Sequence, residues 1–307
     1  MENFGLINKP IDPQRWIYKS NSPLLGGELN SSADWEQYLP VVEYQNLYGF
    51  DTMACVTYSF LNCIETLWKF QGNSERNFSD RFLATMSGTT HAGNTFDGVS
   101  DGARRSGLVN ESQYPHNADS WNEYYKVISD EILEIGKRFL KDYEIKAEYV
   151  RTYRLDHIME ALKSSPLQVT VKYASGEGNL NPTGDWNHAV TCYGYKENEY
   201  WKIYDHYTQT KKKYAWNYEF GAINKFTLQK IKPTFMTVQD NVLYQLVEGL
   251  GQFALGLDGR LIIDDVAKIL ASWEVRNNGD TKGMTKAVRQ ADWDSVPHIS
   301  LKGESIN

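Results

Sequence analysis

The amino-acid sequence predicts an α+β fold, with helices in the first half of the chain and an antiparallel sheet in the second. Three observations support this class. Apolar residues recur at helical spacing from residue 51 onward, and further amphipathic segments continue to about residue 164. Segments rich in β-branched and aromatic residues, separated by Gly, Asn and Asp turns, follow Pro166. Helices that precede strands, without alternating with them, are typical of the α+β class.

The helical half begins with the segment that follows residue 51. One apolar face extends there over about four turns, and Asp51 or Thr52 could form the N-cap. A second helix is expected at 78–86, where Ser79 and Asp80 can cap the first turn. The remaining helices of this half are expected at 97–106, 120–146 and 155–164.

The second half contains short segments with the composition of strands. The expected strands lie at 167–174, 188–196, 200–207, 212–219 and 223–231. Because short turns join several of these segments, neighbouring strands are expected to pair antiparallel. A functional site is expected where the helical and sheet halves meet.

The chain is expected to divide into three parts. Residues 1–33, which contain several prolines and the pair Gly26-Gly27, suggest an extended strap that lies on the main domain. Residues 34–234 form the main α+β domain. Residues 235–307 suggest a small α/β appendage, in which short strands with Gly turns precede a helix at 265–277. The appendage could recognise a partner, mediate self-association or brace the sheet.

Composition and charge argue against several classes of function. A formal net charge of -7 opposes nucleic acid as the main partner, and the short basic run Lys211-Lys212-Lys213 is interpreted as a solvated strand end. No segment reaches the roughly eighteen apolar residues that a membrane span needs. Residues 1–16 lack both a basic start and an apolar run, so no secretory signal is expected.

The cysteine content points to a reducing compartment. Cys55, Cys63 and Cys192 cannot form a disulfide framework. With no secretory signal expected, we predict a cytoplasmic or phage/virion-associated protein. Free cysteines are most often small buried hydrophobic residues, and Cys63 and Cys192 are interpreted in this way.

Cys55 differs from the other two cysteines because of its position and its company. It falls in the first turn of a predicted helix, where unpaired backbone amides carry partial positive charge and are expected to lower the pKa of a thiol. His188 stands at the start of a predicted strand, and Asp205 could reach the same imidazole from the next strand. Thiolate chemistry needs these three residue types.

The other histidines offer weaker candidates. His206 directly follows Asp205 and is expected to point to the opposite face of the sheet, so it is not assigned as the base. His91 is expected to be a surface residue near the proposed substrate loop. A zinc site needs two or more Cys or His residues at close spacing, and the sequence shows none. No metal and no cofactor are therefore expected.

Read in order, the motifs of residues 34 to about 230 resemble those of papain-like cysteine peptidases. "DWEQYLPVVEYQ" resembles the family's Asp-Trp entry and its oxyanion glutamine, and "ACVTYSFLNCIE" resembles the nucleophile helix. "GNTFDGVSDGARRSGLVNESQYPH" resembles the glycine-rich substrate loop, a helix and a Tyr-Pro turn. "NHAVTCYGY" and "YWKIYDHY" resemble the strands that carry the histidine and the third member of the triad.

The resemblance implies a two-lobe papain-like fold, with a helical left lobe and an antiparallel right lobe. It also implies that Cys55 is the nucleophile, His188 the general acid and base, Asp205 the orienting group and Gln45 an oxyanion donor.

The same resemblance implies a set of residues that bind the substrate. Gly93 and Asn94 match the loop that pairs with the substrate backbone, and Asn187 precedes the histidine where the family often has a polar residue. The expected partner is a peptide or protein substrate.

The sequence also departs from the family's pattern. "DTMACV" replaces the usual Cys-Gly-Ser-Cys-Trp, so the paired disulfide and the tryptophan are missing. Gln45 stands further from the cysteine than is usual. Asp205 replaces the commoner Asn, and Tyr207 stands where a Trp usually covers the third member. An Asp can hold the imidazole at least as well.

Three functions remain open on the sequence alone. The chain could be a thiol peptidase, a papain-like scaffold with a binding or structural role and no turnover, or a hydrolase or acyl transferase that acts on cell-wall peptides. The family's long inhibitory pro-segment is not recognised in the sequence. The strap at residues 1–33 is therefore expected to lie on the surface and to leave the site open.

Overall fold

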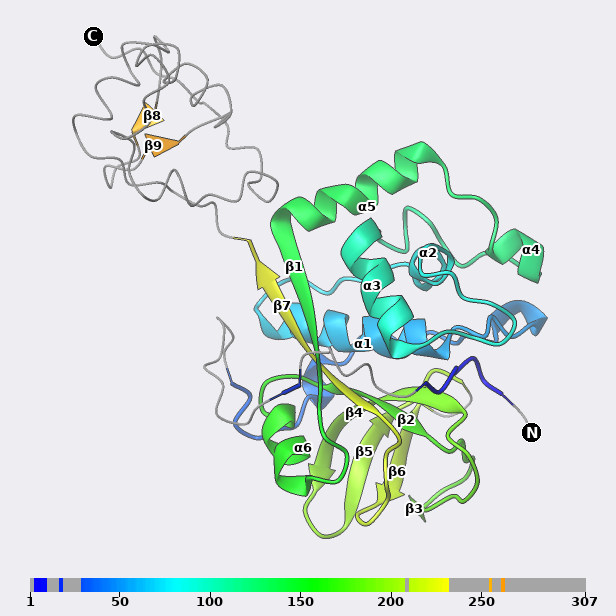
Figure 1. Cartoon of the computed structure of the whole chain (residues 1–307), viewed down its shortest axis with the longest axis vertical. Coiled ribbons are helices and arrows are strands. Elements are labelled where there is room, and N and C mark those ends of the chain that lie inside the picture. The colour runs from blue at the N-terminus through cyan, green and yellow to red at the C-terminus, as the bar shows by residue number, and fades with distance from the viewer. Residues whose placement is uncertain are drawn as a thin grey trace. The chain divides into compact units, whose positions relative to one another are not determined.

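The computed structural model describes residues 3–9, 17–18, 29–207 and 210–231, together with two short strands at 254–255 and 261–262. The chain divides into two compact units, Met1–Ile231 and Lys232–Asn307. In the first unit, helices occupy most of the first half and a seven-stranded, mostly antiparallel sheet follows (Figure 1). The predicted α+β class is confirmed.

The helical elements of the first unit are short, apart from α1, α3 and α5. Their bounds are η1 (Glu36–Tyr38), η2 (Leu47–Gly49), α1 (Cys55–Phe70), α2 (Asp80–Met86), α3 (Phe96–Ser106), α4 (Trp121–Tyr124), α5 (Asp130–Asp142) and α6 (Leu155–Leu162).

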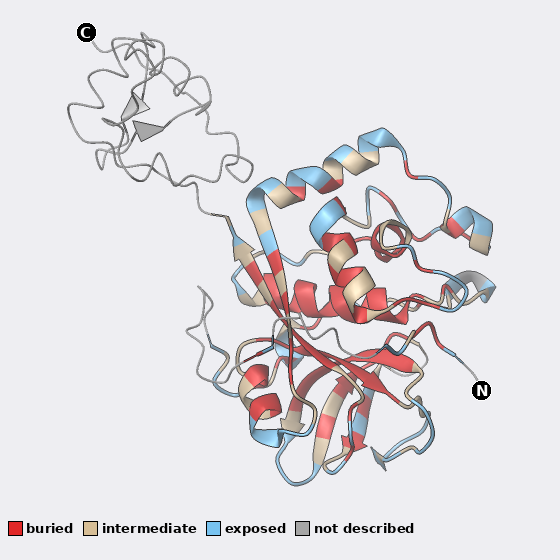
Figure 2. Cartoon of the chain, viewed as in Figure 1, coloured by how far each residue is buried: buried red, intermediate tan, exposed pale blue. Residues whose placement is uncertain are grey.

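Helix α1 is buried on all sides over most of its length. Every residue from Cys55 to Trp68 is buried, whereas the sequence predicted one apolar face (Figure 2). Polar side chains inside the helix bond to nearby backbone, as when Ser59 Oγ donates to the Cys55 carbonyl at 2.8 Å. Gln168 of the sheet donates to the Val56 carbonyl at 2.7 Å. The helix is therefore a tightly held support for its first residue, since buried polar groups that are paired resist movement.

The sheet has the strand order β1-β7-β2-β4-β5-β6-β3, and within it only the β3 and β6 pairing is parallel. Its strands are β1 (Tyr143–Tyr149), β2 (Leu167–Val171), β3 (Asn179–Leu180), β4 (His188–Lys196), β5 (Tyr200–Tyr204), β6 (Lys211–Ala215) and β7 (Ile223–Lys230). Strand β4 is the central strand of this order and β2 is its neighbour; both pack against α1 and are almost entirely buried. This arrangement brings the start of β4 to the start of α1.

The segment 120–146 differs from the single long helix that was expected. It contains α4, a break, α5 and then the first four residues of β1. Strand β1 pairs with β7 over seven positions, from Tyr143 with Lys230 to Tyr149 with Asn224, and buries alternate side chains. Long-range pairing in the sheet has overridden the local helical preference of this segment.

The predicted helix caps have two outcomes. Ser79 caps α2 as expected, because its Oγ accepts a hydrogen bond from the Phe82 N–H at 3.0 Å. Helix α1 begins later than expected, and its N-cap is Ala54, which provides no side-chain bond. Asp51 accepts instead from the Met53 N–H at 2.8 Å, in the turn before the helix.

The second unit is described by two strands, β8 (Ala254–Leu255) and β9 (Leu261–Ile262), which pair antiparallel. The helix predicted at 265–277 lies outside the described residues. Across the part of the chain that the structure describes, no helix combines the length and the apolar character needed to cross a membrane.

Candidate active site

Cys55 is the first residue of α1 and has no solvent exposure. Burial raises the pKa of its thiol well above the ordinary value, and the negative charges of Asp51 and Asp205 raise it further. The backbone N–H groups of Ala189 and Val56 act in the opposite direction, since they stabilise the thiolate. The amide at the helix start acts to lower this pKa as expected, but in this conformation desolvation outweighs it and the pKa is raised.

The sulfur of Cys55 nevertheless lies beside the start of β4. The Ala189 N–H that stabilises it belongs to the residue directly after His188. Two segments that are far apart in the sequence, at the first turn of α1 and the first residues of β4, thus meet at one point.

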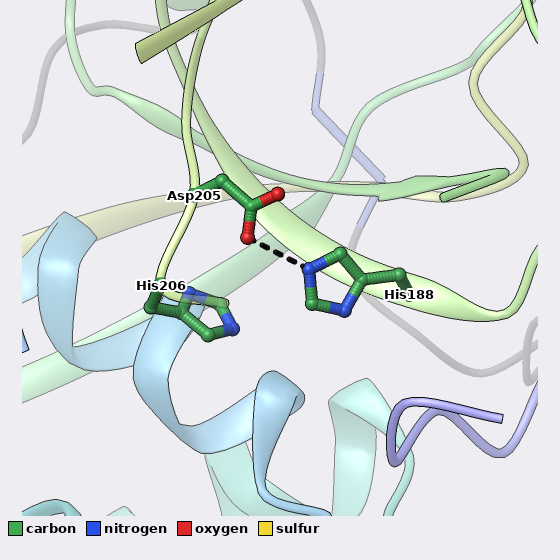
Figure 3. Close-up of side chains that lie close together, drawn as sticks. All are labelled: His188, Asp205 and His206. Carbon is green, nitrogen blue, oxygen red and sulfur yellow. Dashed lines mark hydrogen bonds and ion pairs between the residues drawn. The ribbon is translucent and has the colours of Figure 1, made fainter. Parts of the chain in front are cut away.

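His188 and Asp205 form a buried pair. His188 Nε2 lies 2.9 Å from Asp205 Oδ1 (Figure 3). Both side chains are almost completely shielded from solvent. His188 opens β4, and Asp205 follows the end of β5, the strand that pairs with β4. Among the described residues, His188 Nδ1 has no hydrogen-bond partner. One ring nitrogen is therefore held while the other is available for proton transfer.

Asp205 stays ionised although it is buried. Burial acts to raise the pKa of its carboxyl group, but His188, His206 and Lys212 together hold that pKa well below its ordinary value. The Tyr207 N–H adds a hydrogen bond to Oδ1 at 3.1 Å. The carboxylate can therefore orient the His188 ring and stabilise its protonated form.

The basic run 211–213 does not behave as a solvated strand end throughout. Lys211 and Lys213 are exposed, but Lys212 alternates to the inner face of β6 and is buried. Its Nζ lies 2.6 Å from Asp205 Oδ2. The interpretation of this run is corrected at Lys212, because alternation along a strand sends the middle residue to the opposite face.

His206 also differs from the expectation. Its ring centre lies 5.3 Å from that of His188 and stacks on Tyr58 at 5.2 Å. Strand alternation was the wrong guide, because β5 ends at Tyr204 and the residues after it turn toward the site. Burial lowers the pKa of His206 to about 3, so this ring is neutral.

These side chains are also the group that could hold a metal ion. His188, Asp205 and His206 each offer one ligand atom, and these atoms lie within 4.8 Å of one another. Both carboxylate oxygens are already engaged, one by His188 and the other by the Lys212 ammonium group. A buried lysine cation beside the same carboxylate opposes a second cation there.

Gln45 is fully buried and lies next to the histidines. Its backbone N–H donates to the His206 carbonyl at 3.0 Å. Its side-chain Nε2 donates to Asp51 Oδ1 at 2.7 Å and to the carbonyl of Phe4 at 3.0 Å. The amide expected to bind an oxyanion is therefore directed at a peptide carbonyl of the chain's own N-terminal segment.

The predicted substrate loop is paired with the same segment. Leu6 and Asn94 form a parallel β-bridge, in which the Asn94 N–H donates to the Gly5 carbonyl at 3.0 Å. The Ile7 N–H in turn donates to the Asn94 carbonyl at 2.8 Å. The backbone of this loop is thus paired with the chain's own N-terminal segment; that it binds a substrate stays a prediction.

Two glycines allow this close approach. Gly93 has φ of 95°, and a Cβ built on it would lie 2.0 Å from the Gly5 carbonyl oxygen. Gly5 has φ of 102°, and a Cβ built there would lie 2.1 Å from the Met53 carbonyl oxygen. Only residues without a side chain fit in this stack of backbone segments.

Phe4 packs against His188 of the candidate triad. Its N–H donates to the Asn187 carbonyl at 3.1 Å, and its ring centre lies 5.4 Å from that of His188. Tyr173 and Tyr207 surround the ring, at 4.2 and 4.8 Å. The expectation that the strap leaves the site open is wrong for residues 4–7. These residues contact Gln45, Asn94 and His188, which the open site would leave free for a substrate.

Comparison with known proteins yields matches at the level of structure. No protein-family model matches the sequence, and a search of curated proteins finds no match. Xylellain, a cysteine protease from Xylella fastidiosa, superposes with a TM-score of 0.58 at 15% identity, over 75% of this chain and 97% of that chain.

Two solved proenzymes superpose less completely. Digestive procathepsin L 3 from the larval midgut of Tenebrio molitor gives a TM-score of 0.52 at 16% identity, over 69% of this chain and 73% of that chain. Procathepsin L2 from the same source gives 0.50 at 15%, over 73% and 78%. All three are papain-like cysteine proteases, and the similarity shows that this chain has the papain-like fold.

Proposed function

We propose that this chain is a cysteine-type peptide hydrolase that acts through Cys55, His188 and Asp205. The observation that supports this most strongly is the buried hydrogen bond between His188 Nε2 and Asp205 Oδ1, which leaves Nδ1 without a partner among the described residues. Cys55, at the first position of α1, is near enough to the start of β4 for the Ala189 N–H to act on its sulfur, which also supports the proposal.

The proposed reaction follows the chemistry of a thiolate and an imidazole. His188 Nδ1 takes the proton of the Cys55 thiol, and the sulfur attacks the carbonyl carbon of a peptide bond. Gln45 Nε2 donates to the oxygen that becomes negative. His188 then protonates the leaving amine, and the C–N bond breaks to leave a thioester. Water then gives a proton to His188 and attacks the thioester carbonyl, the C–S bond breaks to release the acid, and the proton returns from His188 to the sulfur.

This function requires that residues 4–7 leave the site. The Phe4 carbonyl already accepts the Gln45 amide, and Gly5 and Ile7 already engage both backbone groups of Asn94. A substrate backbone needs the same groups. In the described conformation the proposed enzyme is therefore closed, and a substrate must compete with the chain's own N-terminal segment.

The closed site also favours one alternative. A cysteine that is completely buried, with a thiol pKa well above the ordinary value, is what a catalytically silent scaffold would show. The peptidase proposal explains in addition why an ionised carboxylate lies against the imidazole, although removing its charge from water is unfavourable.

Incubation of the full-length protein with a denatured protein substrate, with mass spectrometry of the products, tests the function. We expect cleavage that falls by at least about a thousandfold in Cys55→Ala and in His188→Ala, because both remove a member of the triad. His91→Ala, in an exposed ring stacked on Trp121, is the matched control and should keep the parental rate. Cleavage that survives in Cys55→Ala would refute the assignment.

A further inference from the structure

Lys212 is a lysine with almost no contact with solvent. Its exposed fraction is 3%, although it lies on β6 near one edge of the sheet. Lysine side chains are rarely buried to this extent unless they are paired. The neighbouring Lys211 and Lys213 are exposed, so the burial belongs to this position and not to the basic run as a whole.

Three groups surround the ammonium of Lys212. Nζ lies 2.6 Å from Asp205 Oδ2 and donates to the Ala174 carbonyl at 2.9 Å. It also lies 4.5 Å from the centre of the Tyr173 ring. A carboxylate, a carbonyl and an aromatic face together replace the water that this cation loses, so the charge can be kept inside the fold.

The two oxygens of Asp205 therefore have separate partners. Oδ1 faces His188 Nε2 and also accepts the Tyr207 N–H, whereas Oδ2 faces Lys212. A carboxylate that is bonded at both oxygens cannot rotate about its Cβ–Cγ bond without breaking one of these contacts. The direction of Oδ1 toward the imidazole is consequently fixed from the far side of the carboxylate.

We propose that Lys212 is a positioning residue of the candidate active site: its ammonium group holds Asp205 Oδ2 and so keeps Oδ1 directed at His188. This rests on the proposed function, in which Asp205 orients the imidazole. Lys212 touches neither the substrate nor the reacting atoms in this scheme and acts through Asp205. It adds a buried cation to the set of Cys55, His188 and Asp205.

The charged and titratable groups around Asp205 come from α1, β4 and β6 and from the turn between β5 and β6. They are His188 on β4, Cys55 on α1, Lys212 and Tyr214 on β6, and the adjacent His206. Lys212 is the lysine among them and is joined directly to the carboxylate. If it is removed, a buried carboxylate loses a direct cationic partner, and its pKa should rise.

The experiment compares Lys212→Met and Lys212→Arg with the parent in the full-length chain, with exposed Lys213→Met as the matched control. The first readout is the pH dependence of kcat/KM for peptide hydrolysis. We expect Lys212→Met to lower kcat/KM by about 10- to 100-fold at neutral pH, because a misplaced catalytic group costs about that much. Its acidic limb should also move to higher pH, and Lys212→Arg should recover most of the rate.

The second readout does not depend on turnover. The His188 ring N–H that is bonded to Asp205 should give a strongly deshielded proton NMR signal that is absent in His188→Ala. In the parent this signal should disappear below a certain pH, and in Lys212→Met that pH limit should be higher. A third measurement, the double variant Asp205→Asn with Lys212→Met, should be about as slow as Asp205→Asn alone, because both act through one carboxylate.

Distinct outcomes separate this inference from the proposed function. If the parent cleaves no peptide but the pH limit of the NMR signal moves as expected, the peptidase proposal fails and the role of Lys212 in holding Asp205 stands. If Lys212→Met keeps the parental pH profile and the parental pH limit of the signal, and differs only in a lower melting temperature, Lys212 is structural and the inference is overturned.

Discussion

The pKa values of buried carboxyl groups are shifted in opposite directions in the two lobes of this fold. In the sheet lobe, Asp205 is ionised because His188 and Lys212 outweigh the effect of burial. In the helical lobe, burial raises the pKa of Glu65 and Asp80 well above the ordinary range, and the neighbouring carboxyl groups raise it further. The difference lies in the neighbours, since burial is nearly complete in each case.

The comparison shows what maintains a charge inside this protein. A carboxyl group loses the same hydration in either lobe, but only Asp205 receives a lysine and an imidazole in exchange. Glu65 and Asp80 of the helical lobe stay neutral instead. A buried carboxylate charge is thus kept at Asp205, where the proposed chemistry needs it.

The strongest test of this contrast is Asp205→Asn. We expect a loss of hydrolysis of about 10²- to 10⁴-fold, because the imidazole loses its charged partner. The fold should also lose about 3–5 kcal/mol of stability, since the buried Lys212 ammonium is left without its carboxylate. Steady-state kinetics and denaturant titration measure the two effects. A variant as stable as the parent would show that Lys212 does not depend on this pairing.

A second test removes the cover from the site. In Phe4→Ala we expect iodoacetamide to label Cys55 about tenfold faster or more, because less complete burial lowers the pKa of the thiol toward its ordinary value and admits the reagent. Mass spectrometry of the labelled peptide gives the rate. The pKa values of Glu65 and Asp80 should not change.

The control for this test is Phe70→Ala, which also removes a phenyl ring but does so where it packs on Trp35 and Tyr38, outside the contacts of the strap. Its labelling rate should equal that of the parent. Equal labelling in Phe4→Ala and the parent would mean that the segment does not limit access to the sulfur.

The smallest expected effect concerns the stability of the helical lobe. Burial raises the pKa of Glu111 to about 7, so the folded state holds a proton that the unfolded state releases near pH 4.5. This contribution is fully present below about pH 4.5 and is lost as the pH rises to about 7. The loss should amount to roughly 1–3 kcal/mol.

Glu111→Gln should abolish that loss while it keeps the acceptor for the His116 N–H. His116 opposes the trend, because burial lowers its pKa to about 4 and its contribution is lost as the pH falls below about 6.5. The difference between parent and variant isolates the glutamate. Exposed Glu134→Gln is the control, and a parallel pH dependence in parent and Glu111→Gln would contradict the raised pKa.

Much of the fold could be predicted from local patterns. The apolar face after residue 51 predicted α1, and Ser79 predicted the start of α2. Strand β1 was missed because the residues at its start continue a helical pattern, and only its pairing with β7 makes them a strand. Such pairing joins distant segments and is not written in the local sequence.

The candidate site was predictable in part for the same reason. The order of Cys55, His188 and Asp205 suggested that they converge, and the structure places His188 and Asp205 in direct contact. Lys212 was missed because three consecutive lysines suggest solvent, although strand alternation could have singled out the middle one. The cover by Phe4 could not be found, because nothing in residues 3–9 indicates that their partners lie near residues 94 and 187.

The closed state depends on the absence of a side chain at Gly5 and at Gly93. A methyl group on Gly5 would collide with the Met53 carbonyl, and one on Gly93 would collide with the Gly5 carbonyl. Alanine at either position should therefore displace residues 4–7 from the loop and expose the Cys55 sulfur to solvent, with no deletion of the chain.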